Sequence, residues 1–312
     1  MPLVKPNIVI SRCFVDAVRY NGARISSSFM DELKNHVNFI PVCPEMEVGL
    51  GAPRLPLRLV EKKDGVHMIQ QKTERDFTDS MSDFASSFLS GLKDIDGFVL
   101  KSKSPSCGIA SVKIYASMEK KPAVRRDKGL FAEKVKERYS NLPVESEGRV
   151  TDPDIKENFL TAIFSLSEFR NLKKNITSQG KLVDFHTGYK LLFMAFSQSR
   201  MRIMGKIVAN HEKHPFSSVI ESYEREFMEI FTRRANRKSH INVLQHAFGY
   251  FSPKITAGEK KNFLSLLQRY KNGDIPLNFL LEIVRVYIAR TGDSYLIRQK
   301  YFNPYPEELQ WR

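Results

Sequence analysis

Apolar positions in the first half of the chain follow two alternating patterns. Short apolar and β-branched runs, which are typical of strands, occupy residues 7–11, 37–43 and 95–101. Apolar side chains recur at helical spacing over residues 27–36, 82–94 and 128–140. Because strands that alternate with helices usually form parallel sheets, the pattern predicts an α/β domain over residues 1–150.

The pattern changes near residue 150, after which almost every apolar position follows helical spacing. Asp152 and Pro153 suit the N-cap and the first position of a helix that ends near residue 175, and we assign residues 151–180 to a connecting helix. From residue 182 the chain is predicted to be helical, with further helices at about 217–235, 239–251, 257–271 and 276–291. We therefore expect an all-α second domain over residues 181–312.

Length and composition agree with two globular domains. The chain has 312 residues, of which 42% are hydrophobic, and chains of this length tend to divide into two cores. No apolar run approaches the ~20 residues that cross a bilayer. The N-terminal stretch lacks the long apolar segment and cleavage site of a signal peptide. We expect a cytoplasmic protein that does not contact membranes.

The net charge of +14 indicates a polyanionic partner, although a basic surface that serves solubility is the alternative. Residues 1–150 contain 24 Lys and Arg against 19 Asp and Glu, and residues 151–312 contain 25 against 16. The densest basic run, "RRANRK" at 233–238, follows an acidic helical pattern. It suits either phosphate contacts or the C-terminus of that helix, where cations offset the helix dipole.

Three cysteines stand just beyond predicted strands. Cys13 follows the first strand, Cys43 ends the second, and Cys107 lies in the loop after residues 95–101. Ligand-binding loops converge at the carboxyl ends of parallel strands. Thiolates favour zinc and iron–sulfur clusters, but a structural zinc ion needs four ligands and no histidine has matching spacing. Three cysteines can hold a four-iron cluster with one iron left open, and three unrelated thiols are the alternative.

The motifs around these cysteines resemble a known family. "VRYNG" (18–22), "CPEMEVGLGAPRLP" (43–56) and "KSKSPSCG" (101–108) look like the motifs of thiouracil desulfidases (TudS-like). "VDFHTGYKLLFMAFS" (183–197), "NVLQHAFGYF" (242–251) and "YFNPYPEEL" (301–309) look like a YbgA-like helical domain. A fusion of the two is similar to the tRNA 4-thiouridine desulfidases (RudS-like).

The resemblance implies a [4Fe–4S] cluster held by Cys13, Cys43 and Cys107, with one iron left to take the substrate sulfur. It also implies that Glu45 is catalytic and shuttles protons, and that Ser104 is catalytic and orients water or substrate. Without the resemblance, a surface carboxylate and an ordinary turn hydroxyl would be the favoured interpretations of Glu45 and Ser104.

Other residues near these motifs have less specific expectations. Gly49 and Gly51 fit a loop that passes close to a cluster. Arg54 suits a carboxylate or a substrate phosphate, and we favour the carboxylate. Lys101 and Lys103 are placed to attract RNA, although solvated lysines are common on any surface.

Basic side chains of the second domain are the candidates for RNA binding. Contacts from lysine and arginine to phosphates supply affinity without sequence information. The candidates are Lys190, Arg200, Arg202, Lys206, Arg233, Arg234, Arg237 and Lys238. Nearby aromatic residues suit core packing better than base stacking.

The function implied by the resemblance is hydrolytic removal of sulfur from 4-thiouridine in tRNA, which yields uridine and sulfide. Two alternatives remain open. The substrate is a free thiouracil or another small thiolated base, or the chain is a non-enzymatic iron–sulfur protein that binds nucleic acid. The position of Glu45 beside a cysteine argues against the last alternative, because a purely structural cluster needs no carboxylate there.

Overall fold

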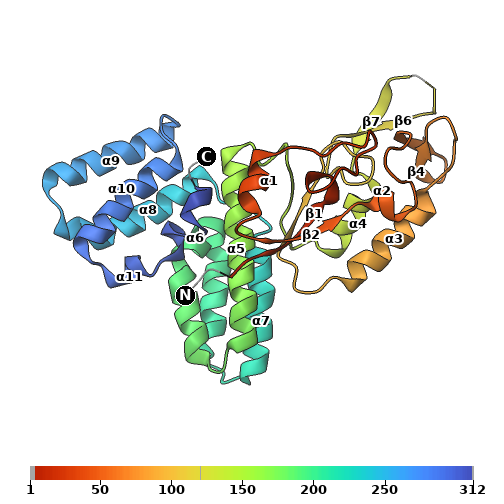
Figure 1. Cartoon of the computed structure of the whole chain (residues 1–312). Helices are drawn as coiled ribbons and strands as arrows, with labels where there is room; N and C mark the ends of the chain where they lie inside the picture. Colours follow the sequence, from red (N-terminus) through yellow and green to blue (C-terminus); the bar gives the residue numbers. More distant parts are fainter. Residues whose placement is uncertain (1–3, 120, 311–312) are drawn as a thin grey trace. The chain divides into compact units, whose positions relative to one another are not determined.

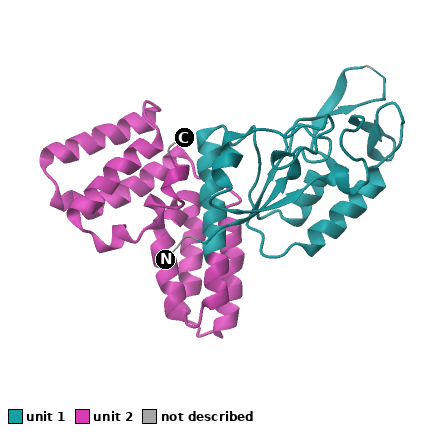
Figure 2. Cartoon of the chain, viewed as in Figure 1, with its two compact units in different colours: residues 1–168 teal, residues 169–312 magenta. Residues whose placement is uncertain are grey.

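The computed structural model describes residues 4–119 and 121–310. The chain divides into two compact units, residues 1–168 and 169–312 (Figure 2). An α/β unit precedes a helical one, which confirms the expected fold class. The boundary falls inside a single helix, α5 (Pro153–Asn175) (Figure 1).

A four-stranded parallel sheet forms the centre of the first unit. Its strands are β1 (Asn7–Ser11), β2 (Asn38–Val42), β5 (Gly97–Leu100) and β8 (Val144–Ser146), in the order β2-β1-β5-β8. Ile8 pairs with Phe39 on one side and with Gly97 on the other. Strand order reverses between β1 and β5, and such switch points are where α/β sheets bind ligands.

A second sheet of four strands was not predicted from the sequence. Its strands are β3 (Leu57–Lys62), β4 (Gly65–Gln70), β6 (Val112–Tyr115) and β7 (Ala123–Asp127), in the order β4-β3-β6-β7. Strands β3 and β4 form an antiparallel hairpin, and β3 and β6 are parallel. The exposed C-terminal end of β3 and most of β7 carry polar residues, so these segments lack the continuous apolar signal of β5.

Helices connect the strands of the first unit. They are α1 (Ser28–Leu33), the short α2 (Pro44–Glu47), α3 (Thr78–Gly91) and α4 (Leu130–Arg138). Met81 and Leu89 of α3 and Phe131 of α4 share a core with Phe98 of β5, and all four are almost completely buried. Burial of large apolar side chains is the main favourable term in folding.

Helix α5 begins as its sequence predicts. The carboxylate of Asp152 accepts hydrogen bonds from the backbone N–H groups of Asp154 and Ile155, both at 3.0 Å, and Pro153 is the first helical residue. Leu160 and Ile163 are fully buried, and Ile163 packs next to Gly97 of β5. The first half of α5 is therefore part of the α/β core as well as a connection.

The second unit consists of helices. They are α6 (Gln179–Ala209), α7 (Phe216–Ile230), α8 (Arg237–Phe251), α9 (Ala257–Asn272), α10 (Leu277–Thr291) and the short α11 (Ser294–Ile297). Aromatic rings of α6 and α7 form its core, where Tyr189 and Phe193 stack at 5.3 Å. Within the described ranges, no helix has the length and apolarity to cross a membrane.

Helix α6 is kinked at Ser197. This residue has extended backbone angles inside the helix, and its hydroxyl accepts the backbone N–H of Arg200 at 3.3 Å. Ser197 therefore caps the second segment of α6 in the manner of a helix N-cap. The basic residues at 200–206 lie on a different helical segment from Lys190.

Candidate functional site

The three cysteines lie at one edge of the parallel sheet. Cys13 lies in a single 3-10 turn, η1 (Arg12–Phe14), directly after β1, and Cys43 directly follows β2 and precedes α2. Cys107 lies in the loop after β5. Because β2, β1 and β5 are adjacent and parallel, the loops that follow them meet at the same edge. All three cysteines are buried and none forms a disulfide.

Burial makes ionisation of these thiols unfavourable. It raises the pKa of Cys13 to about 12, with a further increase from Cys43, and it also raises the pKa of Cys43. Burial also raises the pKa of Cys107, although a hydrogen bond involving Ser11 opposes the increase. Nearby negative charge from Glu45 and Cys13 acts in the same direction as burial on Cys107. The three thiols therefore need a nearby cationic centre to become thiolates.

The loop that carries Cys107 is organised by Ser104. The Ser104 hydroxyl accepts the backbone N–H groups of Ser106 at 3.3 Å and Cys107 at 3.2 Å, and its carbonyl accepts that of Gly108 at 2.9 Å. A Cβ at Gly108 would lie 2.3 Å from Val112 and 2.7 Å from the Ser104 carbonyl oxygen. Only glycine fits there, so Gly108 is required for the tight turn that places Cys107.

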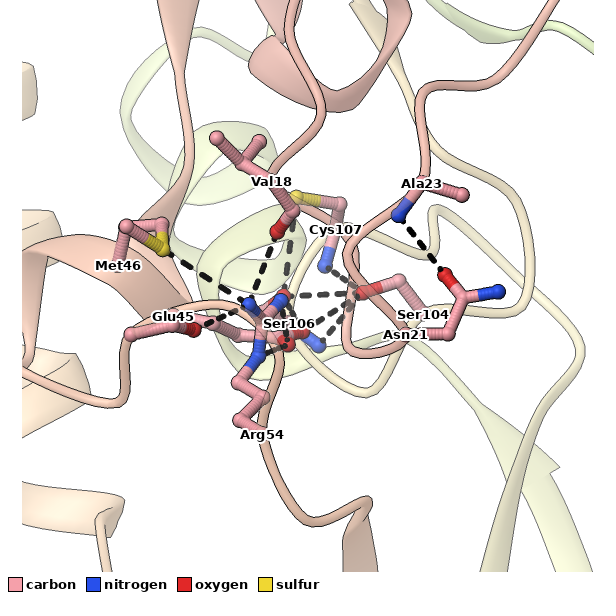
Figure 3. Close-up of polar contacts among 10 residues, drawn as sticks. Val18, Asn21, Ala23, Glu45, Met46, Arg54, Ser104, Ser106 and Cys107 are labelled. Carbon is pink, nitrogen blue, oxygen red and sulfur yellow. Dashed lines mark hydrogen bonds and ion pairs between the residues drawn. The ribbon is translucent and has the colours of Figure 1, made fainter.

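Glu45 and two serines form a hydrogen-bonded group beside Cys107 (Figure 3). The Oε1 atom of Glu45 accepts the Ser106 hydroxyl at 2.7 Å and the Ser104 hydroxyl at 3.3 Å. The two hydroxyl oxygens are 2.9 Å apart, and the Ser106 hydroxyl also lies 3.7 Å from the sulfur of Cys107. The structure thus brings Glu45 and Ser104 together, and it adds Ser106, which the sequence did not single out.

Arg54 occupies the other oxygen of the same carboxylate. Its Nε and Nη2 atoms donate to Oε2 of Glu45 at 2.8 and 2.5 Å, and both side chains are buried. The prediction that Arg54 pairs with a carboxylate is confirmed.

Lys101 is held by Glu147 instead of standing free at the surface. Its ammonium group donates to Oε1 of Glu147, and the hydroxyl of Ser102 donates to the same oxygen at 2.6 Å. Burial disfavours ionisation of Glu147, but these hydrogen bonds outweigh it and lower its pKa. The suggestion that Lys101 attracts RNA therefore conflicts with its ion pair, whereas Lys103 is exposed.

The glycines after Cys43 have backbone angles that favour glycine. Gly49 and Gly51 have φ angles of +81° and +68°, in the left-handed region that glycine adopts without strain. A Cβ at either position would meet no atom within 4 Å. Their role in the chain is therefore to turn the backbone, and not to relieve crowding by neighbouring protein atoms.

The basic candidates of the second unit differ in how they are engaged. Arg200 forms ion pairs with Glu226 at 2.7 Å and Glu229 at 3.4 Å, so it is committed to α7. Arg237 donates to the backbone carbonyl of Tyr270 at 3.1 Å, although the residue remains exposed. The other candidates are also exposed: Lys190, Arg202, Lys206, Arg233, Arg234 and Lys238.

The run at 233–238 does not end the acidic helix. Helix α7 stops at Ile230, and Arg233 and Arg234 lie in the turn that follows. Arg237 and Lys238 begin α8, where a positive charge opposes the helix dipole. The alternative that this run offsets the C-terminal dipole of α7 therefore does not apply to Arg237 and Lys238. Tyr189 and Phe193 are buried, which excludes them from stacking on a base.

Among the described residues, no three histidine, cysteine, aspartate or glutamate side chains form a group suited to a single metal ion. In an iron–sulfur cluster each cysteine binds a different iron, so its ligands need not converge on one point.

Each unit of the chain matches a known family model. Residues 8–147 match the family model described as 2-thiouracil desulfurase, and residues 190–306 match a model described as a protein of unknown function (DUF1722). The "uncharacterized protein YbgA" of Escherichia coli K12 is 33% identical over 157 residues, which cover 50% of this chain and 93% of YbgA. The chain belongs to the YbgA family. Residues 8–147, which match the 2-thiouracil desulfurase model, precede the residues that match the DUF1722 model.

Two further relatives resemble shorter parts of this YbgA-family chain. The "uncharacterized protein YbbK" of Bacillus subtilis 168 is 28% identical over 109 residues, which cover 32% of this chain and 72% of YbbK. A solved structure titled "[4Fe-4S]-dependent thiouracil desulfidase TudS" is 25% identical and covers 47% of this chain and 95% of its own, with a TM-score of 0.38.

Proposed function

We propose that this protein is a desulfidase that hydrolyses 4-thiouridine in tRNA to uridine and sulfide, using a [4Fe–4S] cluster held by Cys13, Cys43 and Cys107. The observation that carries the proposal is the hydrogen-bonded group of Glu45, Ser104 and Ser106 next to three buried thiols. The match of residues 8–147 to the 2-thiouracil desulfurase model supports it.

The donor set fits such a cluster. Three thiols with raised pKa values are buried at one edge of the sheet, where only a cationic centre would favour their thiolate form. These are all the cysteines in the chain, so a four-iron cluster bound by them has one iron without a cysteine ligand. When bound, the cluster supplies a Lewis acid that polarises a thiocarbonyl sulfur. Because thiols stay reduced in the cytoplasm, the proposed location of the protein is the cytoplasm.

The residues of the chain supply the proton transfers. Replacing the sulfur of a thiocarbonyl by the oxygen of water consumes one water, releases hydrogen sulfide and needs no electrons. Two protons must pass from water to sulfur, and Glu45 is placed to accept and return them through Oε1. The Ser106 hydroxyl donates to Oε1. The Ser104 hydroxyl lies 2.9 Å from the Ser106 hydroxyl, and Ser104 is the less buried of the two residues.

Exposed basic residues of the second unit support a tRNA substrate. A net charge of +14 and exposed cations at residues such as Lys206, Arg233 and Lys238 suit contacts with phosphates. A thiolated base in folded tRNA must leave its stack to reach a buried site, which costs a few kcal/mol. Binding of the tRNA body through phosphate contacts would offset that cost.

The test is turnover by the anaerobically reconstituted protein on thiolated tRNA and on free 4-thiouracil. Sulfide release and loss of thiocarbonyl absorbance report the reaction. We expect a strong preference for tRNA. Equal or better turnover of the free base would assign the enzyme to small thiolated bases. A reconstituted cluster with no turnover on either substrate would favour an iron–sulfur nucleic-acid-binding protein.

A further inference from the structure

We propose that Arg54 is a positioning residue that fixes which oxygen of Glu45 takes part in proton transfer. This inference rests on the proposed function, because it assumes that Glu45 moves protons there. It concerns a part of the carboxylate that the two serines do not touch. The evidence is the way Arg54 divides its donors between Glu45 and the backbone.

Arg54 donates hydrogen bonds to one oxygen of the Glu45 carboxylate, and the two serines donate to the other. Its Nε and Nη2 atoms both donate to Oε2 of Glu45, at 2.8 and 2.5 Å. Both serine hydroxyls contact Oε1. Charge-assisted hydrogen bonds of this kind are stronger and shorter than neutral ones, so Oε2 stays with the guanidinium. Oε1 is then the oxygen that exchanges protons through the serines.

The guanidinium is anchored independently of Glu45. Its Nη1 atom donates to the backbone carbonyls of Val18 at 2.9 Å and Gly51 at 2.7 Å. The backbone N–H of Arg54 also donates to the carbonyl of Tyr20 at 2.8 Å. Arg54 therefore joins the loop after Cys13 to the loop after α2, and the position of its side chain is set by backbone atoms of both.

Burial makes this arrangement selective for arginine. The side chains of Arg54 and Glu45 are only 5% and 11% exposed. A buried carboxylate that loses its cation is strongly disfavoured, and lysine is a point charge that cannot reproduce the fork of donors. Lysine at this position would keep the charge but would allow the carboxylate to rotate. A displacement of about 1 Å in a catalytic group can cost about 100-fold in rate.

The experiment compares Arg54→Lys and Arg54→Ala with the wild type and with Arg58→Ala. Arg58 is a matched control, because its guanidinium also donates to backbone carbonyls, those of Met118 and Glu119, in the same unit. For both Arg54 variants we expect kcat on thiolated tRNA, the proposed substrate, to fall about 10- to 100-fold with KM changed little. Iron content and the visible absorption of the reconstituted protein should equal those of the wild type.

Two further readouts separate positioning from a general structural role. Added guanidinium should restore part of the activity of Arg54→Ala, but not that of Glu45→Ala. A crystal structure of Arg54→Ala should show the Glu45 carboxylate turned away from Ser106. If Arg54→Ala does not fold, Arg54→Lys carries the kinetic test by itself.

The outcomes are distinguishable from a failure of the proposed function. A wild type and an Arg58→Ala variant that both lack turnover would overturn the proposed function. An active wild type with kcat unchanged in Arg54→Lys would overturn the positioning role alone. Loss of iron together with activity in Arg54→Lys would also overturn it, because it would assign Arg54 to holding the cysteine loops.

Discussion

Ser104 and Ser106 are two residues apart and yet have different surroundings. Ser106 is buried, and its hydroxyl makes the shorter contact with Glu45, at 2.7 Å. The Ser104 hydroxyl is 3.3 Å from Glu45 and accepts the backbone N–H groups of Ser106 and Cys107. Ser106 is placed to pass a proton. Ser104 also holds the turn that carries Cys107.

Substitution of the two serines should therefore have different consequences. In Ser106→Ala we expect kcat to fall about 10- to 100-fold with iron content unchanged, because a hydrogen bond to a charged group is lost. In Ser104→Ala we expect lower iron content as well, since the turn before Cys107 loses its side-chain acceptor. Iron analysis and anaerobic turnover measure both effects. Ser90→Ala, at an exposed position on α3, is the control. Equal iron loss in both variants would contradict this division of roles.

The start of α8 shows how an element positions candidate RNA-binding residues. The Asn236 side chain accepts the backbone N–H of Ser239 at 3.0 Å, and the Ser239 hydroxyl accepts that of Asn236 at 3.0 Å. This capping box satisfies donors that the helix leaves free. It also fixes the first turn, which carries Arg237 and Lys238. The residues that cap the helix and the candidate RNA-binding residues are therefore neighbours but not the same residues.

Asn236→Ala and Lys238→Ala should separate these two properties. Loss of the cap should lower the free energy of unfolding by about 1 kcal/mol. Lys238→Ala should leave the melting temperature unchanged and weaken tRNA binding, with little dependence on tRNA sequence. Circular dichroism melts and filter binding at fixed salt are the measurements. A Lys238→Ala variant with wild-type affinity for tRNA would show that Lys238 does not contact tRNA.

At the scale of the whole molecule, two buried histidines make the stability of the helical unit depend on pH. His186 lies 3.3 Å from the hydroxyl of Tyr223, and His240 lies 2.9 Å from that of Tyr301. Burial lowers the pKa of both histidines to about 4, from an ordinary value of 6.5, with a smaller contribution from Lys190 at His186. Both are therefore neutral in the folded protein at pH 7.

Acid should destabilise the helical unit over a defined range. Between pH 6.5 and 4 the unfolded chain binds protons that the folded one does not, so stability falls as pH falls. Each histidine accounts for on the order of 3 kcal/mol by pH 4. Urea unfolding followed by circular dichroism at several pH values tests this. His240→Gln should flatten the dependence, and His246→Gln, at an exposed position on α8, should not. A flat profile in the wild type would contradict the prediction.

Salt should distinguish the two substrate classes. If about four phosphates are neutralised, affinity for tRNA falls roughly 100-fold between about 50 and 200 mM salt, whereas turnover of free 4-thiouracil barely changes. Arg202→Ala and Lys206→Ala should each reduce the salt slope by about 1. Lys261→Ala, an exposed lysine of α9, is the control. Equal salt dependence for both substrates would mean that the basic residues do not contribute to tRNA binding.

Local patterns in the sequence predicted three strands of the parallel sheet, most of the long helices and the cysteines of the site. The apolar run at residues 97–100 predicts a strand, and the helical spacing after residue 150 predicts helices. Both patterns lie within single elements, so neighbouring residues are enough to recognise them. The cysteines after β1, β2 and β5 were assigned to one edge because parallel strands share a direction. Polar strands such as β7 were missed, since their pairing with distant partners stabilises them more than their own residues do.

Only the tertiary structure decided which side chains act together at that edge. Ser106 lies 61 residues from Glu45 in the chain, and no spacing rule joins them. Arg200 looked like Lys206 in the sequence, but packing of α6 against α7 pairs it with Glu226. A hydrogen bond or an ion pair depends on positions within a few tenths of an ångström, and folding alone brings distant residues to such distances.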